Sequence, residues 1–332
     1  MLPWFSRIGR RRALQGAVAA LAVCGLLLWW LLPSRSPSPE GRITFSTGVP
    51  TGVYQKYGEL LEEALRRHMP KVEVTLNTSE GSQQNLARVA SGDADFTVAT
   101  ADAVATYQRN RRPGAERLRG CARLYDDYVQ LVVPADSRIR TVADLRGKRV
   151  AVGQEGSGVR LLSNRLLAAA GLDPERGIRP VSIGIDTMPG QLESDSIDAF
   201  FWSGGLPTSA VRDLSERMSV RLVPLGPDLV EALQKPGGTT GYYRSAVMPA
   251  DAYAKVSNQA AVPTVAVANL LVTTDRTDPE LTERFTETVI ASRDRIGRQV
   301  HAAQLVDLRT AIYTDPLPLH EGAARYYRSA KP

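Results

Sequence analysis

The sequence contains few of the residues that most often perform catalysis or bind metals. Among 332 residues there are three histidines and two cysteines. His68, His301 and His320 stand far apart, and none has a second ligand at metal-binding spacing. Cys24 lies inside an apolar run, so no disulfide with Cys121 is expected. The chain also lacks a G-x-S-x-G element, a P-loop and a dinucleotide fingerprint. The sequence therefore predicts no enzyme, no cofactor and no metal site.

The positive charge of the chain is concentrated at its start. The net charge is +6, but residues 1–42 hold six arginines against the single acidic residue Glu40. The remaining residues carry 35 basic and 34 acidic side chains. Because nucleic-acid binding needs a basic surface on the folded part, no nucleic-acid partner is expected.

Residues 1–40 have the pattern of a membrane segment followed by a linker. Residues 13–32 are apolar except for Gln15, and Arg10-Arg11-Arg12 precede them. Twenty helical residues span about 30 Å, the thickness of a bilayer core. The positive-inside rule keeps the arginines cytoplasmic and places the rest on the extracytoplasmic face of the membrane. A signal peptide cleaved near Ala20-Leu21-Ala22 is the alternative. Residues 33–39, rich in Ser and Pro, predict an extended linker.

Short apolar runs alternate with helix-like segments along the rest of the chain. This alternation predicts an α/β fold with largely parallel sheets. One intervening helix is expected to bury Tyr57, Leu60, Leu61, Ala64 and Leu65, which share one face. The nine predicted strands are residues 42–46, 72–77, 96–99, 128–133, 149–152, 178–183, 197–202, 220–223 and 264–272.

Two connections predict a division into two lobes. A crossover is expected at residues 134–140, before a short capped helix at 141–146, and a return is expected near residues 243–249. The predicted first lobe comprises residues 41–134 and 246–332, and the second comprises residues 135–245.

Four turns rich in glycine and serine each follow a predicted strand and precede a helix-like segment. A helix start offers unpaired N–H groups and a partial positive charge, and glycine allows a ligand close to the backbone. Taken singly, such a turn is more often a requirement of the backbone alone. Together, the four predict one binding cleft at the carboxyl ends of the strands. The turns are Ser46-Thr47-Gly48 continuing to Gly52, Ser79-Glu80-Gly81-Ser82, Gly153 to Gly158, and Ser203-Gly204-Gly205.

At these turns the chain resembles a known family, the TAXI-type solute receptors of TRAP transporters. No single piece is diagnostic, but their order is specific over about residues 42–328. The resemblance rests on Thr51-Gly52-Val53-Tyr54, Glu80-Gly81-Ser82-Gln83-Gln84-Asn85-Leu86, Ser91-Gly92-Asp93-Ala94-Asp95, Asp144-Leu145-Arg146-Gly147-Lys148, Gly156-Ser157-Gly158, Ile197-Asp198-Ala199-Phe200-Phe201, Gly204-Gly205-Leu206-Pro207 and Leu319-His320-Glu321-Gly322-Ala323.

The resemblance implies a two-lobed, type II-like periplasmic-binding-protein fold that closes on a small organic acid or amino acid. It also implies TRAP membrane subunits as partners. A sensing domain of the same fold, coupled to a signalling partner, is the alternative. The expected ligand-binding residues are Gly48, Gly52, Tyr54, Gly81, Ser82, Asn85, Asp102, Tyr125, Ser157, Gly158, Val159, Trp202, Gly204 and Gly205.

Two features leave the ligand open at this stage. Thr51, Gln55, Thr100 and Ala101 replace residues that are usual in the family at the expected pocket. A carboxylate ligand would need a cation or neutral donors at helix starts. Arg88 and Arg160 are the candidate cations, because each follows a glycine turn closely, although a solvent-facing position is expected more often for both.

Overall fold

The computed structural model describes Gln15, Val23 and residues 39–234 and 239–330. The predicted membrane segment, residues 13–32, lies outside the described residues except for Gln15 and Val23, and it stays a prediction. The predicted linker at residues 33–39 likewise lies outside them except for Pro39. Over the described ranges, no helix combines the length and apolar character that crossing a bilayer requires.

Ten strands and the helices between them make up the described body. The strands are β1 (Gly41–Ser46), β2 (Val72–Asn77), β3 (Phe96–Thr100), β4 (Leu118–Pro134), β5 (Arg149–Ala151), β6 (Arg179–Val181), β7 (Ala199–Gly204), β8 (Val220–Val223), β9 (Tyr243–Met248) and β10 (Val262–Thr274). The α-helices are α2 (Val53–His68), α3 (Ser82–Ser91), α4 (Ala101–Arg109), α5 (Gly158–Ala169), α6 (Met188–Glu193), α7 (Ser209–Arg217), α8 (Pro227–Leu233), α9 (Pro279–Ala291), α10 (Arg293–Gly297), α11 (Leu308–Ala311) and α12 (Glu321–Ala330). Short 3₁₀ helices are η1 (Ala115–Arg117), η2 (Val142–Leu145), η3 (Thr239–Tyr242) and η4 (His301–Leu305).

The strands form one mixed sheet in the order β2-β1-β3-β10-β4-β7-β5-β6, with β8 beside β4 and β9 beside β10. β1 is parallel to β2 and β3, and β5 is parallel to β6 and β7. The two longest strands, β4 and β10, are antiparallel to each other and to their other neighbours. Each of the nine predicted strands overlaps an observed one. The first half of β4 and the whole of β9 were not among them.

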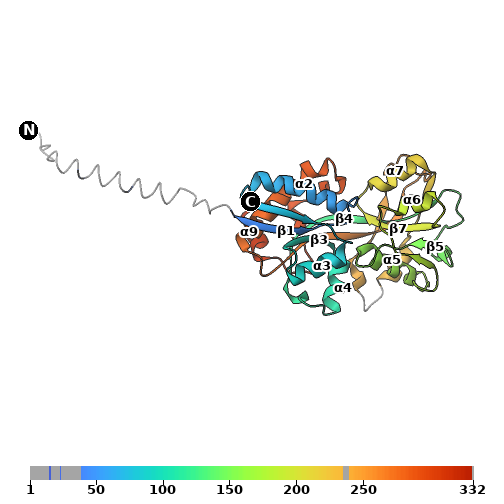
Figure 1. Ribbon diagram of the computed structural model, residues 1–332, viewed down its shortest axis with the longest axis horizontal. Helices are drawn as coiled ribbons and strands as arrows, with labels where there is room; N and C mark the ends of the chain where they lie inside the picture. Colours follow the sequence, from blue (N-terminus) through green and yellow to red (C-terminus); the bar gives the residue numbers. More distant parts are fainter. Residues whose placement is uncertain (1–14, 16–22, 24–38, 235–238, 331–332) are drawn as a thin grey trace, which may run out of the picture. The chain divides into compact units, whose positions relative to one another are not determined.

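Apolar residues fill the first lobe around β1 and β3. Figure 1 shows these two strands side by side in this lobe. Phe96 on β3 stacks on Phe285 of α9 with ring centroids 4.1 Å apart. The predicted apolar face of α2 is confirmed, since its five expected residues, from Tyr57 to Leu65, are all buried. The sequence pattern therefore placed this helix on the sheet correctly.

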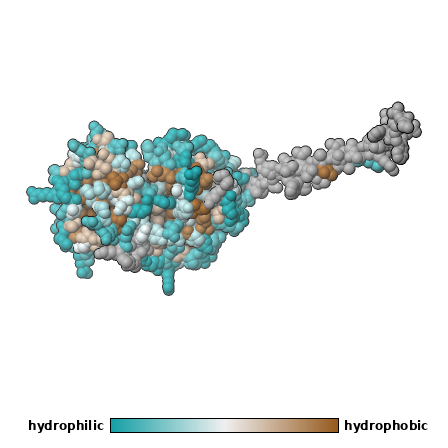
Figure 2. Space-filling view, turned by 180° about the vertical axis from the view of Figure 1, so that it is seen from behind, coloured by the Kyte–Doolittle hydropathy of each residue, from teal (hydrophilic) through white to brown (hydrophobic). Residues whose placement is uncertain are grey.

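A second group of apolar residues fills the other lobe, around β5, β7 and β8. It includes Leu166 on α5 and Phe200 on β7, and it extends along the chain to Met248 and Val267. The short capped helix predicted at residues 141–146 is present as η2, with the Thr141 and Asp144 capping box. On the face shown in Figure 2, hydrophobic residues are interspersed with hydrophilic ones, as expected when apolar side chains fill internal cores.

The chain passes between the two lobes within β4 and β10. β4 pairs with β10 up to Tyr128 and with β7 and β8 beyond it, and β10 changes its partner from β9 to β3 after Val267. The strand pairing thus favours a first crossing within β4, before the predicted boundary at residue 134. It favours a second crossing within β10, after the predicted boundary at residue 246. The predicted lobe boundaries stay a prediction.

Candidate ligand-binding site

The four glycine- and serine-rich turns lie around one cleft between the two lobes. They lie at or just beyond the ends of β1, β2, β5 and β7, since Ser203 and Gly204 are the last residues of β7, so the cleft opens at the carboxyl ends of these strands, where ligands bind in open α/β sheets. The lining residues are Gly48, Val49, Gly52, Val53, Tyr54, Glu80, Gly81, Ser82, Thr100, Asp127, Gly153, Gln154, Ser157, Gly158, Val159, Gly184, Ile185, Met188, Trp202, Ser203 and Gly204.

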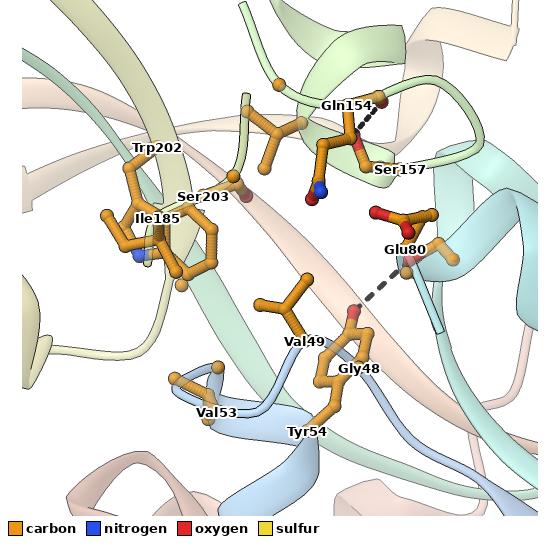
Figure 3. A pocket seen from close by; sticks show the side chains of 18 of the residues that line it. Gly48, Val49, Val53, Tyr54, Glu80, Gln154, Ser157, Ile185, Trp202 and Ser203 are labelled. Carbon is orange, nitrogen blue, oxygen red and sulfur yellow. Dashed lines mark hydrogen bonds between the residues drawn. The ribbon is translucent and has the colours of Figure 1, made fainter. Parts of the chain in front are cut away.

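Most of the residues expected at the site line this cleft. They are Gly48, Gly52, Tyr54, Gly81, Ser82, Ser157, Gly158, Val159, Trp202 and Gly204. Figure 3 shows Tyr54 and Val49 on one side and Trp202 and Ile185 together on another, with the space between them open. That these residues contact a ligand stays a prediction.

Four expected residues lie elsewhere. Asn85 is fully buried and bonds only to protein atoms. Asp102 accepts hydrogen bonds from Tyr243 and Arg165 outside the cleft lining. Tyr125 packs against Tyr57, with ring centroids 5.9 Å apart, in the first-lobe core. Gly205 faces a separate depression beside Ala302. These residues were expected at the site because they lie close to the turns in sequence. In the structure they contact other parts of the protein instead of the cleft.

The lobes contact each other directly at the cleft rim. The Gln83 side-chain amide donates to the carbonyl oxygen of Ser157 at 2.7 Å, and the backbone N–H of Gln84 donates to the carbonyl of Gly156 at 3.0 Å. Gly81 lies beside this contact with a φ of +126°, a backbone conformation that favours glycine. These contacts hold the two lobes in a closed arrangement.

A chain of hydrogen bonds runs along the polar part of the cleft. The Tyr54 hydroxyl lies 3.2 Å from the Ser82 hydroxyl, the contact dashed at Tyr54 in Figure 3. It donates to Asn269 Oδ1 at 2.5 Å. The Asn269 amide nitrogen donates to Asp127 at 2.7 Å, and Ser203 donates to the other oxygen of that carboxylate at 3.4 Å. Strands β4, β7 and β10 thus position groups from both lobes in one network.

Asp127 is the titratable centre of this network. It is buried, and the loss of hydration raises its pKa to about 7, while the hydrogen bonds from Asn269 and Ser203 oppose the rise. Burial also raises the pKa of Tyr54 well above its ordinary value, and the charge of Asp127 adds to that effect. Tyr54 therefore stays a neutral hydrogen-bond donor, whereas Asp127 changes charge near neutral pH.

Replacing Asp127 with asparagine is expected to stabilise the protein increasingly as pH rises. The folded carboxyl holds its proton to a higher pH than the unfolded one, so its burial costs stability that grows as pH rises from about 4 to about 7. The advantage of Asp127→Asn should therefore grow by about 2 kcal/mol between pH 5.5 and pH 8.5. Urea denaturation at both pH values measures it.

The matched control is Asp251→Asn, because Asp251 is exposed. We expect its free energy of unfolding to follow that of the unchanged protein at both pH values. A constant difference between Asp127→Asn and the unchanged protein would contradict the proposed titration of Asp127.

The candidate cations are occupied elsewhere. Arg88 donates to the Ser46 hydroxyl and to the carbonyl of Thr78, and Arg160 pairs with Glu175 at 2.7 Å. Neither lines the cleft. Among the described lining residues, the acidic side chains are Glu80 and Asp127, and no basic one is present.

Several lining residues were missed as individual candidates. Glu80, Gln154 and Gly153 lie inside the turns that were predicted to form the cleft, so their place in the sequence already indicated a position at the site. Asp127 lies beside Asp126 just before the predicted strand at 128–133, so its burial at the cleft had no sequence signal. Ile185 and Met188 had no signal, since apolar residues in a loop and a helix usually belong to a core.

The Ser157 hydroxyl caps a helix. It donates to the carbonyl of Gln154 at 2.6 Å and accepts the N–H of Arg160 at 3.0 Å at the start of α5. A serine nucleophile would instead direct its proton to a base. The geometry of Ser157 is therefore that of an N-cap residue.

Three solved structures show how this chain compares with known proteins. A protein from Bordetella bronchiseptica RB50 is similar at 15% identity and a TM-score of 0.50, over 88% of this chain and 80% of that one. A putative L-cystine ABC transporter from Listeria monocytogenes has 14% identity and a TM-score of 0.49, over 80% and 98%. The periplasmic aliphatic sulphonate-binding protein SsuA from Escherichia coli has 17% identity and a TM-score of 0.47, over 89% and 84%.

The profile of the NMT1-like family matches residues 45–330, a range that includes all four turns, both lobes and both connecting strands. The predicted two-lobed α/β architecture, with two crossing strands and a cleft between the lobes, is present in the structure. The chain therefore belongs to the NMT1-like family and has a two-lobed α/β fold.

Proposed function

We propose that this protein is an extracytoplasmic solute-binding receptor that captures a small organic acid or amino acid between its lobes. The observation that carries the proposal is the closed cleft, which two separate lobes line with four turns. Two crossing strands allow the lobes to move apart and close again on a ligand. The fold and the Ser157 cap agree with a binding role in place of a catalytic one.

The proposal extends to the membrane. The apolar stretch at residues 13–32 anchors the receptor, and its folded body faces the extracytoplasmic side. The partners are the membrane subunits of a TRAP-type transporter, and the order of motifs along residues 42–328 supports this assignment.

Ligand capture is tested with the purified full chain by thermal unfolding in the presence of amino acids and organic acids. A ligand at one hundred times its Kd stabilises the folded state by about 2.7 kcal/mol. This should raise Tm by roughly 5 °C or more. Metabolites retained from an extract of the native host are identified in parallel by mass spectrometry. A flat Tm across the panel, with no metabolite retained, would contradict the receptor function.

The transporter assignment needs its own measurement. Affinity capture of the full chain from its native membrane is expected to recover two TRAP-type membrane subunits. Recovery of an ABC permease with its ATPase, or of a histidine kinase, would refute the TRAP assignment and leave ligand binding intact.

A further inference from the structure

The cleft has an unusual charge for a site expected to hold an acid. Glu80 and Asp127 are the charged side chains of its lining, and no arginine, lysine or histidine is found among the described lining residues. An anionic ligand placed here would approach one or two carboxylates, with only helix starts to attract it. The electrostatics of the described lining thus favour a positively charged group.

Glu80 offers an acceptor that no protein group uses. Its Oε2 atom is buried and has no hydrogen-bond partner among the described residues. Its backbone is fixed, because the N–H of Glu80 donates to the Gln84 side chain at 2.8 Å. In Figure 3 the Glu80 side chain extends into the cavity, as does that of Gln154. A carboxylate without a hydrogen-bond donor is costly to bury, and an ammonium group in the cavity would supply a donor to the Glu80 carboxylate.

Asp127 adds negative charge at the inner end of the polar network. Both of its oxygens already accept hydrogen bonds, from Asn269 and Ser203. It therefore acts mainly through its charge, while Glu80 has the open hydrogen-bonding position. A cation bound nearby would favour the ionised form of Asp127.

The remaining wall is apolar and comes from both lobes. Val49 belongs to the first turn and Val53 begins α2, while Ile185, Met188 and Trp202 belong to the second lobe. The indole N–H of Trp202 donates to Thr208 at 3.0 Å, which fixes the ring and leaves its carbon surface for contact. This wall suits an apolar side chain or ring.

We propose that the ligand carries a protonated amino group, bound by Glu80, on an apolar body that packs against Trp202, Ile185 and Met188. This inference rests on the proposed function. It selects, from the two ligand classes named there, the amino-bearing one, and it assigns Glu80 as the residue that sets the specificity.

The test compares ligands that differ only in the amino group, using the full chain and isothermal titration calorimetry. The pairs are phenylalanine with 3-phenylpropionate, leucine with 4-methylpentanoate, and phenethylamine with 2-phenylethanol. In at least one pair, we expect the amino compound to bind at least tenfold more tightly than its partner. The metabolite retained from the native host should also contain an amino group.

Two variants connect this preference to Glu80. Glu80→Gln keeps the shape of the side chain and removes its charge, and it should weaken binding of the amino compound at least tenfold. Glu155→Gln is the matched control, because Glu155 is exposed in a neighbouring turn and does not line the cleft. It should leave the Kd unchanged, and circular dichroism verifies that both variants are folded.

The outcomes separate the two proposals. If a ligand without an amino group binds more tightly than its amino counterpart, or if Glu80→Gln binds as well as the unchanged chain, the inference is wrong and the receptor function stands. If neither the panel nor the native extract yields a bound ligand, the receptor function fails and the inference fails with it.

Discussion

Replacing Asn85 with alanine is expected to lower the free energy of unfolding by about 3–5 kcal/mol. The Asn85 side-chain oxygen accepts from the hydroxyls of Ser46 and Ser79, both at 2.7 Å. Its amide nitrogen donates to the carbonyls of Thr47 and Val98, at 2.8 and 2.9 Å. The site is fully buried, so alanine would leave these groups without water to replace the lost bonds.

Urea denaturation measures this loss, and Asn77→Ala is the matched control. Asn77 is exposed at the end of β2, so its replacement should change the free energy of unfolding by less than about 0.5 kcal/mol. Below the unfolding transition, Asn85→Ala should bind ligand with an unchanged Kd, because Asn85 does not line the cleft. A stable Asn85→Ala variant with weakened binding would instead support the direct ligand contact expected from the sequence.

The sequence was sufficient to predict most of the fold because its apolar residues follow regular patterns. The buried face of α2 has helical spacing, and short apolar runs mark β1, β3 and β10. The first half of β4 was missed because Arg119, Arg123 and Asp126 interrupt its apolar residues. Arg119 pairs with Asp275 and Asp126 with Arg244, which are distant partners that a local pattern does not reveal.

The site was predictable where the backbone itself forms it. Glycine and serine turns have a local signature, and residues of all four turns line the cleft. The direction of a side chain has no such signature. Asn85 follows Ser82 by three residues but bonds to Thr47 and Val98, and Tyr125 lies on Tyr57. Asp127 and Ile185 reach the cleft through tertiary packing, which sequence spacing alone does not specify.

Replacing Arg165 with methionine is expected to lower the free energy of unfolding by about 2–4 kcal/mol and to favour the open arrangement of the lobes. Arg165 on α5 of the second lobe donates to Asp102 on α4 of the first lobe at 3.2 Å. It also donates to Tyr243 at 2.7 Å and to Thr106 at 2.7 Å. Tyr243 in turn donates to Asp102 at 2.6 Å. Because the Asp102 side chain is only 2% exposed, its charge would lose its cationic partner in a buried position.

A double-mutant cycle distinguishes this interlobe contact from a general effect of losing an arginine. Asp102→Asn removes the buried charge, so the combined variant should lose less stability than the two single changes together, with a coupling of about 1–3 kcal/mol. The matched control is Arg284→Met, which breaks an exposed pair with Glu287 and should cost less than about 1 kcal/mol of stability.

Urea denaturation gives the coupling free energy, and the ligand dissociation rate reports on the opening of the lobes. Arg165→Met should release ligand faster than the unchanged chain, because the Arg165–Asp102 contact that it removes joins the two lobes in the closed arrangement. An unchanged dissociation rate with a reduced stability would mean that the contact supports the fold without controlling closure.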